Sequence, residues 1–188
     1  MARFELAGEA TGLANGRADM LDFRPIASVA RGTICQLLNA SYEGWPDRDE
    51  HVENWRAADQ ESFNNPDTVG ACAVFTFLGN EVIGFVSWDP REFPTAIIGH
   101  NCVEPSLRGR GVGKAQLRNL LRILGNRSFR EAIVTTGLGE FFEPARRMYL
   151  ACGFQAVRTV SASGDPMTID YRLDLQRVCC DEVDEHGS

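Results

Sequence analysis

The sequence RGRGVGK, residues 108–114, places three glycines and three cations in seven positions. It follows Thr95–Val103, a run rich in β-branched residues that predicts a strand, and it opens Val112–Leu124, where leucines recur at helical spacing. A tight turn of small residues between a strand and a helix leaves unpaired backbone N–H groups around one point, and such a point attracts anions. The stretch therefore predicts an anion-binding loop at the start of a helix.

Two common nucleotide-binding motifs do not fit this loop. A P-loop requires glycine where Arg108 stands and Ser or Thr where Ala115 stands. A dinucleotide fingerprint that starts at Gly109 requires glycine where Lys114 stands, and one that starts at Gly111 requires glycine where Gln116 stands. We expect the loop to hold a pyrophosphate on its backbone; the alternative is a plain strand-to-helix connection with solvated cations.

The charge is distributed unevenly along the chain. Nineteen Lys and Arg against 26 Asp and Glu give a formal net charge of -7, which argues against nucleic-acid binding. Residues 105–130 nevertheless carry seven cations and no acid. We therefore expect no nucleic-acid partner and a local anion ligand beside the glycine-rich loop.

Length and composition predict a single domain. The 188 residues are 44% hydrophobic and 24% charged, close to the averages for globular proteins. Residues 1–20 show no firm periodicity, and residues 177–188 are acidic. We expect an N-terminal arm at 1–20, one domain at 21–176 and an acidic tail at 177–188.

Several cellular settings are disfavoured by sequence patterns. The longest apolar runs, such as Ala71–Leu78, are shorter than the roughly 18 residues that suggest a membrane span. Glu5 and Glu9 interrupt the region that a signal peptide would need to be apolar. The six cysteines include no C-x-x-C pair, and the three histidines do not lie at zinc-site spacing. We expect a cytoplasmic protein with reduced cysteines, no bound metal and no membrane contact.

Periodicity and breakers predict an alternation of strands and helices. Strands are expected at Leu21–Ile26, Ala71–Leu78, Glu81–Trp88, Thr95–Val103, Ala132–Thr136, Phe154–Val160 and Met167–Leu175. Helices are expected from a Ser28 cap to Tyr42, from Asp47 or Asp49 to about Gln60, over Val112–Leu124 and over Pro144–Ala151.

Two motifs together resemble the GCN5-related N-acetyltransferase (GNAT) superfamily. RGRGVG satisfies every defined position of the pattern R/Q-x-x-G-x-G/A that follows a strand in that family. EPARRMY, residues 143–149, ends in Cys152-Gly153-Phe154 and resembles a later family helix, in which a tyrosine precedes a Gly-Phe exit by four residues. The resemblance covers about residues 21–176. It implies an α+β fold with a central twisted, mixed and mostly antiparallel sheet of six to seven strands, flanked by about four helices.

The resemblance also implies acetyl-CoA as co-substrate and an amine of a small molecule or peptide as acceptor, with direct transfer. The pyrophosphate would lie on the loop, and the pantetheine arm would follow the main chain of Asn101, Cys102 and Val103. Tyr149 matches the residue that protonates or hydrogen-bonds the CoA sulfur in many relatives; its helical spacing from Ala145 also suits a core aromatic. The implied cofactor-binding loop is Arg108, Gly109, Arg110, Gly111, Val112, Gly113 and Lys114.

Some positions depart from the family pattern or leave roles open. Phe142 stands where many relatives carry an Asn that contacts the cofactor. The general base is His100, Glu104 or a chain of waters, and the strand parity of His100 favours a packed histidine over a base. A pair of His100 with Cys102 is a further alternative, although a buried cysteine is the simpler interpretation.

The acceptor side is less well determined. Aromatic and acidic residues alternate in residues 42–50 and could receive a cationic amine, or they could form a solvated helix start. A non-catalytic acyl-CoA-binding or sensing domain is the alternative to an enzyme, and a phosphate-ligand binder unrelated to CoA is a third hypothesis. The sequence allows a homodimer and does not fix the oligomeric state.

Overall fold

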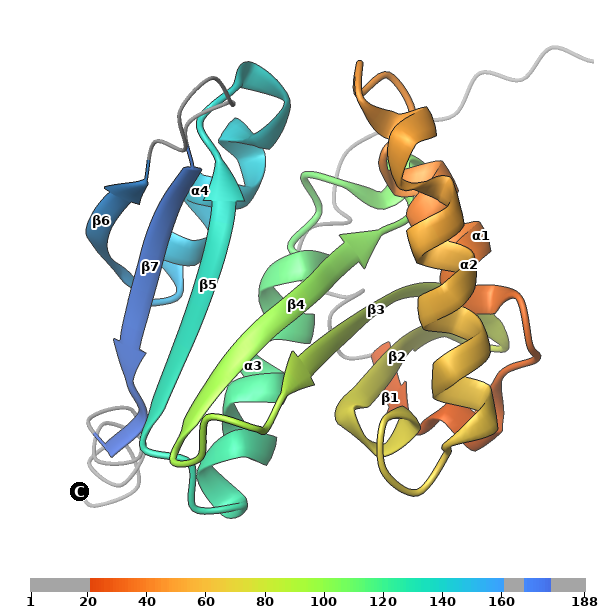
Figure 1. Cartoon of the computed structure of the whole chain (residues 1–188), viewed down its shortest axis with the longest axis horizontal. Helices are drawn as coiled ribbons and strands as arrows, with labels where there is room; N and C mark the ends of the chain where they lie inside the picture. The colour runs from red at the N-terminus through yellow and green to blue at the C-terminus, as the bar shows by residue number, and fades with distance from the viewer. Residues whose placement is uncertain (1–20, 161–167, 177–188) are drawn as a thin grey trace, which may run out of the picture.

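The computed structural model describes residues 21–160 and 168–176. The expected arm at 1–20, the turn at 161–165 and the tail at 177–188 lie outside the described residues. Seven strands form one sheet in the order β1-β2-β3-β4-β5-β7-β6 (Figure 1). The strands are β1 (Leu21–Arg24), β2 (Ala73–Leu78), β3 (Glu81–Asp89), β4 (Thr95–Val103), β5 (Glu131–Gly137), β6 (Gln155–Val160) and β7 (Thr168–Asp174). The α-helices are α1 (Thr33–Ser41), α2 (Arg48–Asn64), α3 (Val112–Asn126) and α4 (Glu143–Ala151).

Helices cover both faces of this sheet. All strand pairs are antiparallel except β4 with β5. Ile34, Leu38 and Trp55 bring α1 and α2 onto one face, over Phe75 and Phe85. The leucines of α3 and the inner side of α4 pack on the opposite face. The expected mixed, mostly antiparallel α+β architecture is confirmed. None of the described helices is both long and apolar enough to span a membrane.

Strands β4 and β5 separate along their length, and this separation creates the space for a site. They pair only where Thr95–Ile98 lies beside Glu131–Val134, and they diverge beyond that point (Figure 1). The register of β3 with β4 shifts between Val86 and Trp88, so β4 gains a residue in a β-bulge before Asn101. Among the described residues, the main chain of β4 from Gly99 onward has no strand partner on the side of β5.

The bulge also reverses the faces to which side chains of β4 point. Ala96 and Ile98 are buried against α3, whereas Cys102 is buried with α1 and α2. Without the extra residue, Ile98 and Cys102 would share a face, because alternate residues of a strand point the same way. The inserted residue thus turns Asn101 and Val103 toward α3 and α4.

The start of α1 differs from the sequence prediction. Ser28 lies in a short 3-10 turn, and the helix begins at Thr33 after Gly32, whose φ is 96°. The carboxylate of Asp59 in α2 takes the role of the cap: it accepts hydrogen bonds from the backbone N–H of Gly32 at 2.8 Å and of Ile34 at 3.0 Å. A cap supplied from 25 residues away leaves no local sequence signal.

Other element boundaries moved by a few residues. The first strand ends at Arg24 instead of Ile26, and α2 continues to Asn64 instead of stopping near Gln60. Gly125 and Asn126 are the last residues of α3 instead of its stop. The chain leaves that helix through Ser128, which has a positive φ of 64°.

Candidate active site

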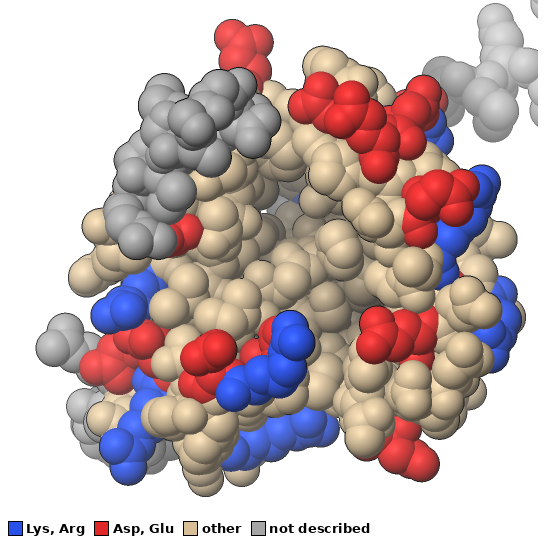
Figure 2. All heavy atoms as spheres, in the orientation of Figure 1, with Lys and Arg blue, Asp and Glu red and all other residues tan. Residues whose placement is uncertain are grey.

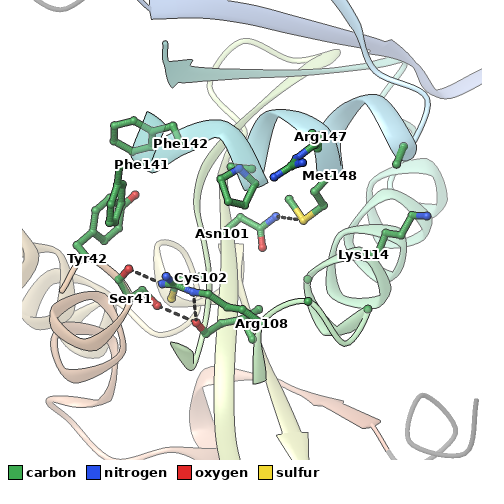
Figure 3. A pocket seen from close by; sticks show the side chains of 17 residues that line it. Ser41, Tyr42, Asn101, Cys102, Arg108, Lys114, Phe141, Phe142, Arg147 and Met148 are labelled. Carbon is green, nitrogen blue, oxygen red and sulfur yellow. Dashed lines mark hydrogen bonds between the residues drawn. The ribbon is translucent and has the colours of Figure 1, made fainter. Parts of the chain in front are cut away.

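A cavity of about 550 Å³ lies at the point where β4 and β5 diverge. Its walls come from the end of β4, the glycine-rich loop before α3, one side of α4 and the turn after α1 (Figure 3). This volume falls in the usual range for small-molecule sites. On the face seen in Figure 2, the molecule is hollowed at its centre, with acidic side chains around parts of the rim.

The glycine-rich loop has the open backbone that an anion site would need, and we call it the cradle. Gly109 and Gly111 have φ values of 72° and 85°, in the left-handed region that favours glycine. A Cβ at either position would meet no atom within 4 Å, so their backbone is open to a ligand. Within residues 21–160 and 168–176, no side chain caps the start of α3, whose first N–H groups have no intrahelical acceptor. Gly109, Gly111, Gly113 and Lys114 all line the cavity.

Gly113 serves a different purpose from the other two glycines. A Cβ there would lie 3.0 Å from the sulfur of Met148, so the bare Cα allows α3 to approach α4 closely. Arg110 is exposed beside the cradle, and Val112 is half-buried at the helix start. The cradle is therefore a backbone site flanked by the charges of Arg110 and Lys114.

Arg108 lines the cavity, but its guanidinium is engaged by protein atoms. It donates hydrogen bonds to the backbone oxygen of Ser41, at the end of α1, and to that of Val103 at 3.4 Å (Figure 3). The Ser41 hydroxyl donates to the same Val103 oxygen at 3.2 Å. Arg108 therefore ties the loop to α1, a role that the sequence prediction of a ligand-binding cation did not include.

A buried amide network lies beneath the end of β4. Gln116 of α3 is fully buried and accepts a hydrogen bond from the Thr76 hydroxyl at 2.5 Å. Its Nε2 donates to the Asn101 side-chain oxygen at 2.6 Å, to the Phe85 backbone oxygen at 3.0 Å and to the Cys102 backbone oxygen at 3.2 Å. Gln116 thus fixes the bulged strand and orients Asn101. Asn101 therefore contributes its side chain, as well as its main chain, to this end of β4.

Tyr149 is a core aromatic that lies outside the cavity wall. Its side chain is 5% exposed, and its ring lies 5.7 Å from Phe154 and 6.0 Å from Tyr171. It is absent from the cavity wall, which α4 forms mainly through Pro144, Ala145 and Met148. Burial raises the pKa of Tyr149, and a hydrogen bond with the Asn101 side chain opposes that rise. The tyrosine is therefore a neutral donor behind Asn101.

The cysteine and histidine of β4 do not form a nucleophilic pair. Cys102 is buried, and burial raises its pKa to about 12, opposed by a hydrogen bond with Ser41. His100 is half-buried with its ring 6.1 Å from Phe85, and burial, with a smaller effect from His51, lowers its pKa. The thiol is therefore inert, and the imidazole is neutral near pH 7. Glu104 is half-buried, outside the cavity wall, with its backbone N–H bonded to Ile83.

The aromatic residues after α1 pack against one another. Tyr42 lies 5.3 Å from Trp45, 5.1 Å from Trp55 and 5.8 Å from Phe141, measured between ring centroids. Burial raises the pKa of Tyr42 to about 12. These rings pack on one another, and Tyr42 and Phe141 also line the cavity.

The sequence matches a known protein family. The family model of the acetyltransferase (GNAT) family matches residues 32–154, which includes the loop, the cavity and α4. The chain belongs to the GNAT acetyltransferase family. It is therefore an acyltransferase. No curated protein matches the sequence.

Solved GNAT structures share the fold at low sequence identity. A GNAT-family protein from Desulfovibrio desulfuricans is 21% identical with a TM-score of 0.66, over 82% of this chain and 99% of that chain. A spermidine N-acetyltransferase chimera of Vibrio cholerae SpeG and hSSAT is 12% identical with a TM-score of 0.67, over 85% and 98%. The PaiA N-acetyltransferase of Thermoplasma acidophilum in complex with coenzyme A is 15% identical with a TM-score of 0.61, over 81% and 99%.

Several residues of this GNAT site were missed by the sequence reasoning. Gln116 falls on the leucine stripe of its helix, between Gly113 and Leu117, and a polar residue on an apolar stripe is the signal that could have found it. Ser41 and Phe141 carry no such signal, because they reach the cavity only through tertiary packing. Among the described residues, no cluster of three or more His, Cys, Asp or Glu could hold a metal ion.

Proposed function

We propose that the protein transfers the acetyl group of acetyl-CoA directly to a primary amine of a small molecule or peptide. The observation that carries this proposal is that a single cavity borders two features of the backbone. It reaches the open glycine backbone at the start of α3 and the unpaired edge of β4. A diphosphate joined to an extended amide chain needs both features, side by side.

The donor fits the residues present. The backbone of Gly109, Gly111 and Gly113 would receive the pyrophosphate, with Arg110 and Lys114 supplying charge. The main-chain groups of residues 101–103 that face the gap, and are not already bonded to β3, Gln116, Ser41 or Arg108, would hydrogen-bond the pantetheine amides as a neighbouring strand does. A solved relative with the same fold is in complex with coenzyme A, which supports this donor.

The chemistry requires a neutral amine and a proton for the departing sulfur. The amine nitrogen attacks the thioester carbon, the C–N bond forms, the C–S bond breaks and the thiolate leaves. Tyr149, kept protonated by burial, would give that thiolate its proton, with Asn101 holding the hydroxyl in place. The nitrogen loses a further proton to solvent once the C–N bond has formed, and the tyrosine regains one from solvent, so the net release is one proton per ammonium acetylated. A primary amine with a pKa near ~10 must first lose a proton. Neutral His100, Glu104 and a water chain remain the candidates to accept it.

An amine acceptor is supported by a relative that shares the fold. One structural neighbour is a spermidine N-acetyltransferase. Acidic side chains lie around the hollow in Figure 2, where they would attract a cationic acceptor. We therefore expect small polyamines and amine-terminated peptides to be the first acceptors to test.

The decisive experiment is an amine panel with acetyl-CoA, following thiol release and detecting the acetylated product by mass. The expected result is a product 42 mass units heavier, about one acetyl group in place of a proton, with stoichiometric thiol. Coenzyme A binding without transfer to any amine would favour a non-catalytic acyl-CoA-binding domain instead. The specific observation in favour of that second function is the position of Tyr149 behind the cavity wall. No thermal stabilisation by coenzyme A would contradict both.

A further inference from the structure

One end of the cavity is closed by three aromatic side chains. Tyr42, Phe141 and Phe142 line this end, and Lys114 lies across the cavity from them (Figure 3). Tyr42 comes from the turn after α1, whereas the two phenylalanines come from the 3-10 turn before α4. We call these three residues the aromatic wall. The wall therefore joins two segments that lie on either side of the gap between β4 and β5.

Phe142 is fixed by an unusually close contact with the end of β5. A Cβ built on Gly137 would lie 2.5 Å from Cδ2 and 2.8 Å from Cε2 of Phe142. The ring therefore rests on a bare Cα, a position that any other residue at 137 would displace. Because the backbone of β5 stands directly behind it, Phe142 cannot retreat from a ligand in that direction.

The other two rings are held by a second layer of aromatic residues. Trp45 lies 5.3 Å from Tyr42 and 5.6 Å from Phe142, and Trp55 lies 5.1 Å from Tyr42. Trp55 is 3% exposed and belongs to the core under α1 and α2. Phe141 and Phe142 meet edge to face at 5.1 Å. The half-buried wall thus rests on neighbouring rings, of which Trp55 belongs to the packed core and yields little to an added group.

We propose that the aromatic wall sets the acyl-chain length of the donor, so that the enzyme uses acetyl-CoA and excludes longer acyl-CoA thioesters. The inference rests on the proposed function, which puts the pyrophosphate at the glycine-rich loop and so directs the acyl end toward the rings. A chain longer than acetyl would have to extend toward the apolar carbons of these rings. In an apolar pocket, one methylene changes kcat/KM by roughly 10- to 200-fold.

The test compares acetyl-, propionyl-, butyryl- and hexanoyl-CoA as donors with one accepted amine. For the wild-type enzyme, kcat/KM should fall about tenfold or more for each added methylene until no turnover remains. Phe142→Ala should reduce the difference between acetyl and butyryl to less than about threefold, because it removes the ring that Gly137 supports. Phe93→Ala is the matched control: this ring is 60% exposed, contacts Phe129 and lies outside the cavity. Its donor preference should equal that of the wild type.

A binding measurement separates failure of this inference from failure of the proposed function. Thioether analogues of the same acyl-CoA series are titrated by calorimetry into wild type, Phe142→Ala and the milder Phe142→Leu. If no analogue binds the wild type, the proposed function fails. If the wild type binds all lengths equally, or if both variants keep the wild-type preference for acetyl, the wall does not set chain length, although the proposed function stands. A change in amine preference alone would also overturn the inference.

Discussion

Replacing Gln116 with leucine tests whether the buried amide network holds the bulged end of β4. The substitution keeps roughly the same volume and removes both polar atoms of a fully buried side chain. The Thr76 hydroxyl, also fully buried, loses its acceptor, and the backbone oxygens of Phe85 and Cys102 each lose one donor. An unsatisfied buried group costs about 1–3 kcal/mol. Because backbone oxygens have a second lone pair, we expect a total loss of about 2–4 kcal/mol in the free energy of unfolding.

The assay is urea denaturation, read by tryptophan fluorescence, with thermal melting as a second measure. For a chain of this size, the melting temperature should fall by roughly 2–4 °C for each kcal/mol lost. Gln60→Leu, at an exposed position of α2, is the matched control and should change the unfolding free energy by less than about 0.5 kcal/mol.

A double variant sharpens the test. Thr76→Val with Gln116→Leu removes both partners of one hydrogen bond, so it should be less destabilised than the sum of the single variants by about 1 kcal/mol. A Gln116→Leu protein as stable as the control would refute the reasoning, because the network would then contribute nothing. Strict additivity in the double variant would show that Thr76 and Gln116 do not depend on each other.

Three further predictions concern the site and its supports. Tyr149→Phe should lower kcat by about 100-fold or more. The Kd for coenzyme A, measured by calorimetry, should change less than about threefold. An unchanged kcat would contradict the role of Tyr149 as the general acid. Asp59→Ala removes the cap of α1 and should lower the free energy of unfolding by about 2 kcal/mol. Asp49→Ala, at an exposed position, should lower it far less. Equal losses in a denaturation experiment would contradict the capping role of Asp59. Burial lowers the pKa of His100 below its ordinary 6.5, so the unfolded chain binds a proton at this histidine before the folded chain does. The free energy of unfolding should therefore fall as the pH drops below about 6.5. A His100→Gln protein whose unfolding free energy has the same pH dependence as the wild type would contradict this.

The sequence predicted the fold well, because the elements that define it carry local signals. The positions of β2 and β3 on either side of Gly79-Asn80, of the leucine stripe of α3 and of the glycine-rich loop were each confirmed. The start of α1 was wrong because its cap comes from Asp59, in another helix. Local patterns cannot show such partners.

The site was predicted less completely than the fold, for the same physical reason. Backbone positions such as Gly109 and Gly111 were found because glycine itself reports the conformation. The pointing direction of Asn101 depends on a bulge in β4, which shifts parity without any marker in the sequence. The engagement of Arg108 with Ser41 depends on a helix 67 residues earlier. Side-chain roles set by such distant contacts required the structure.

Strands β4 and β5 diverge near the centre of the sheet and leave a gap between them. Backbone amides of residues 99–103 and 135–137 that do not point toward β3 or β7 border this gap, where neither strand hydrogen-bonds to the other. A ligand chain lying there would act as an inserted strand and protect those amides. Slower deuterium uptake on both edges upon addition of acetyl-CoA would therefore report occupancy of the gap directly, with no acceptor present and no chemistry required.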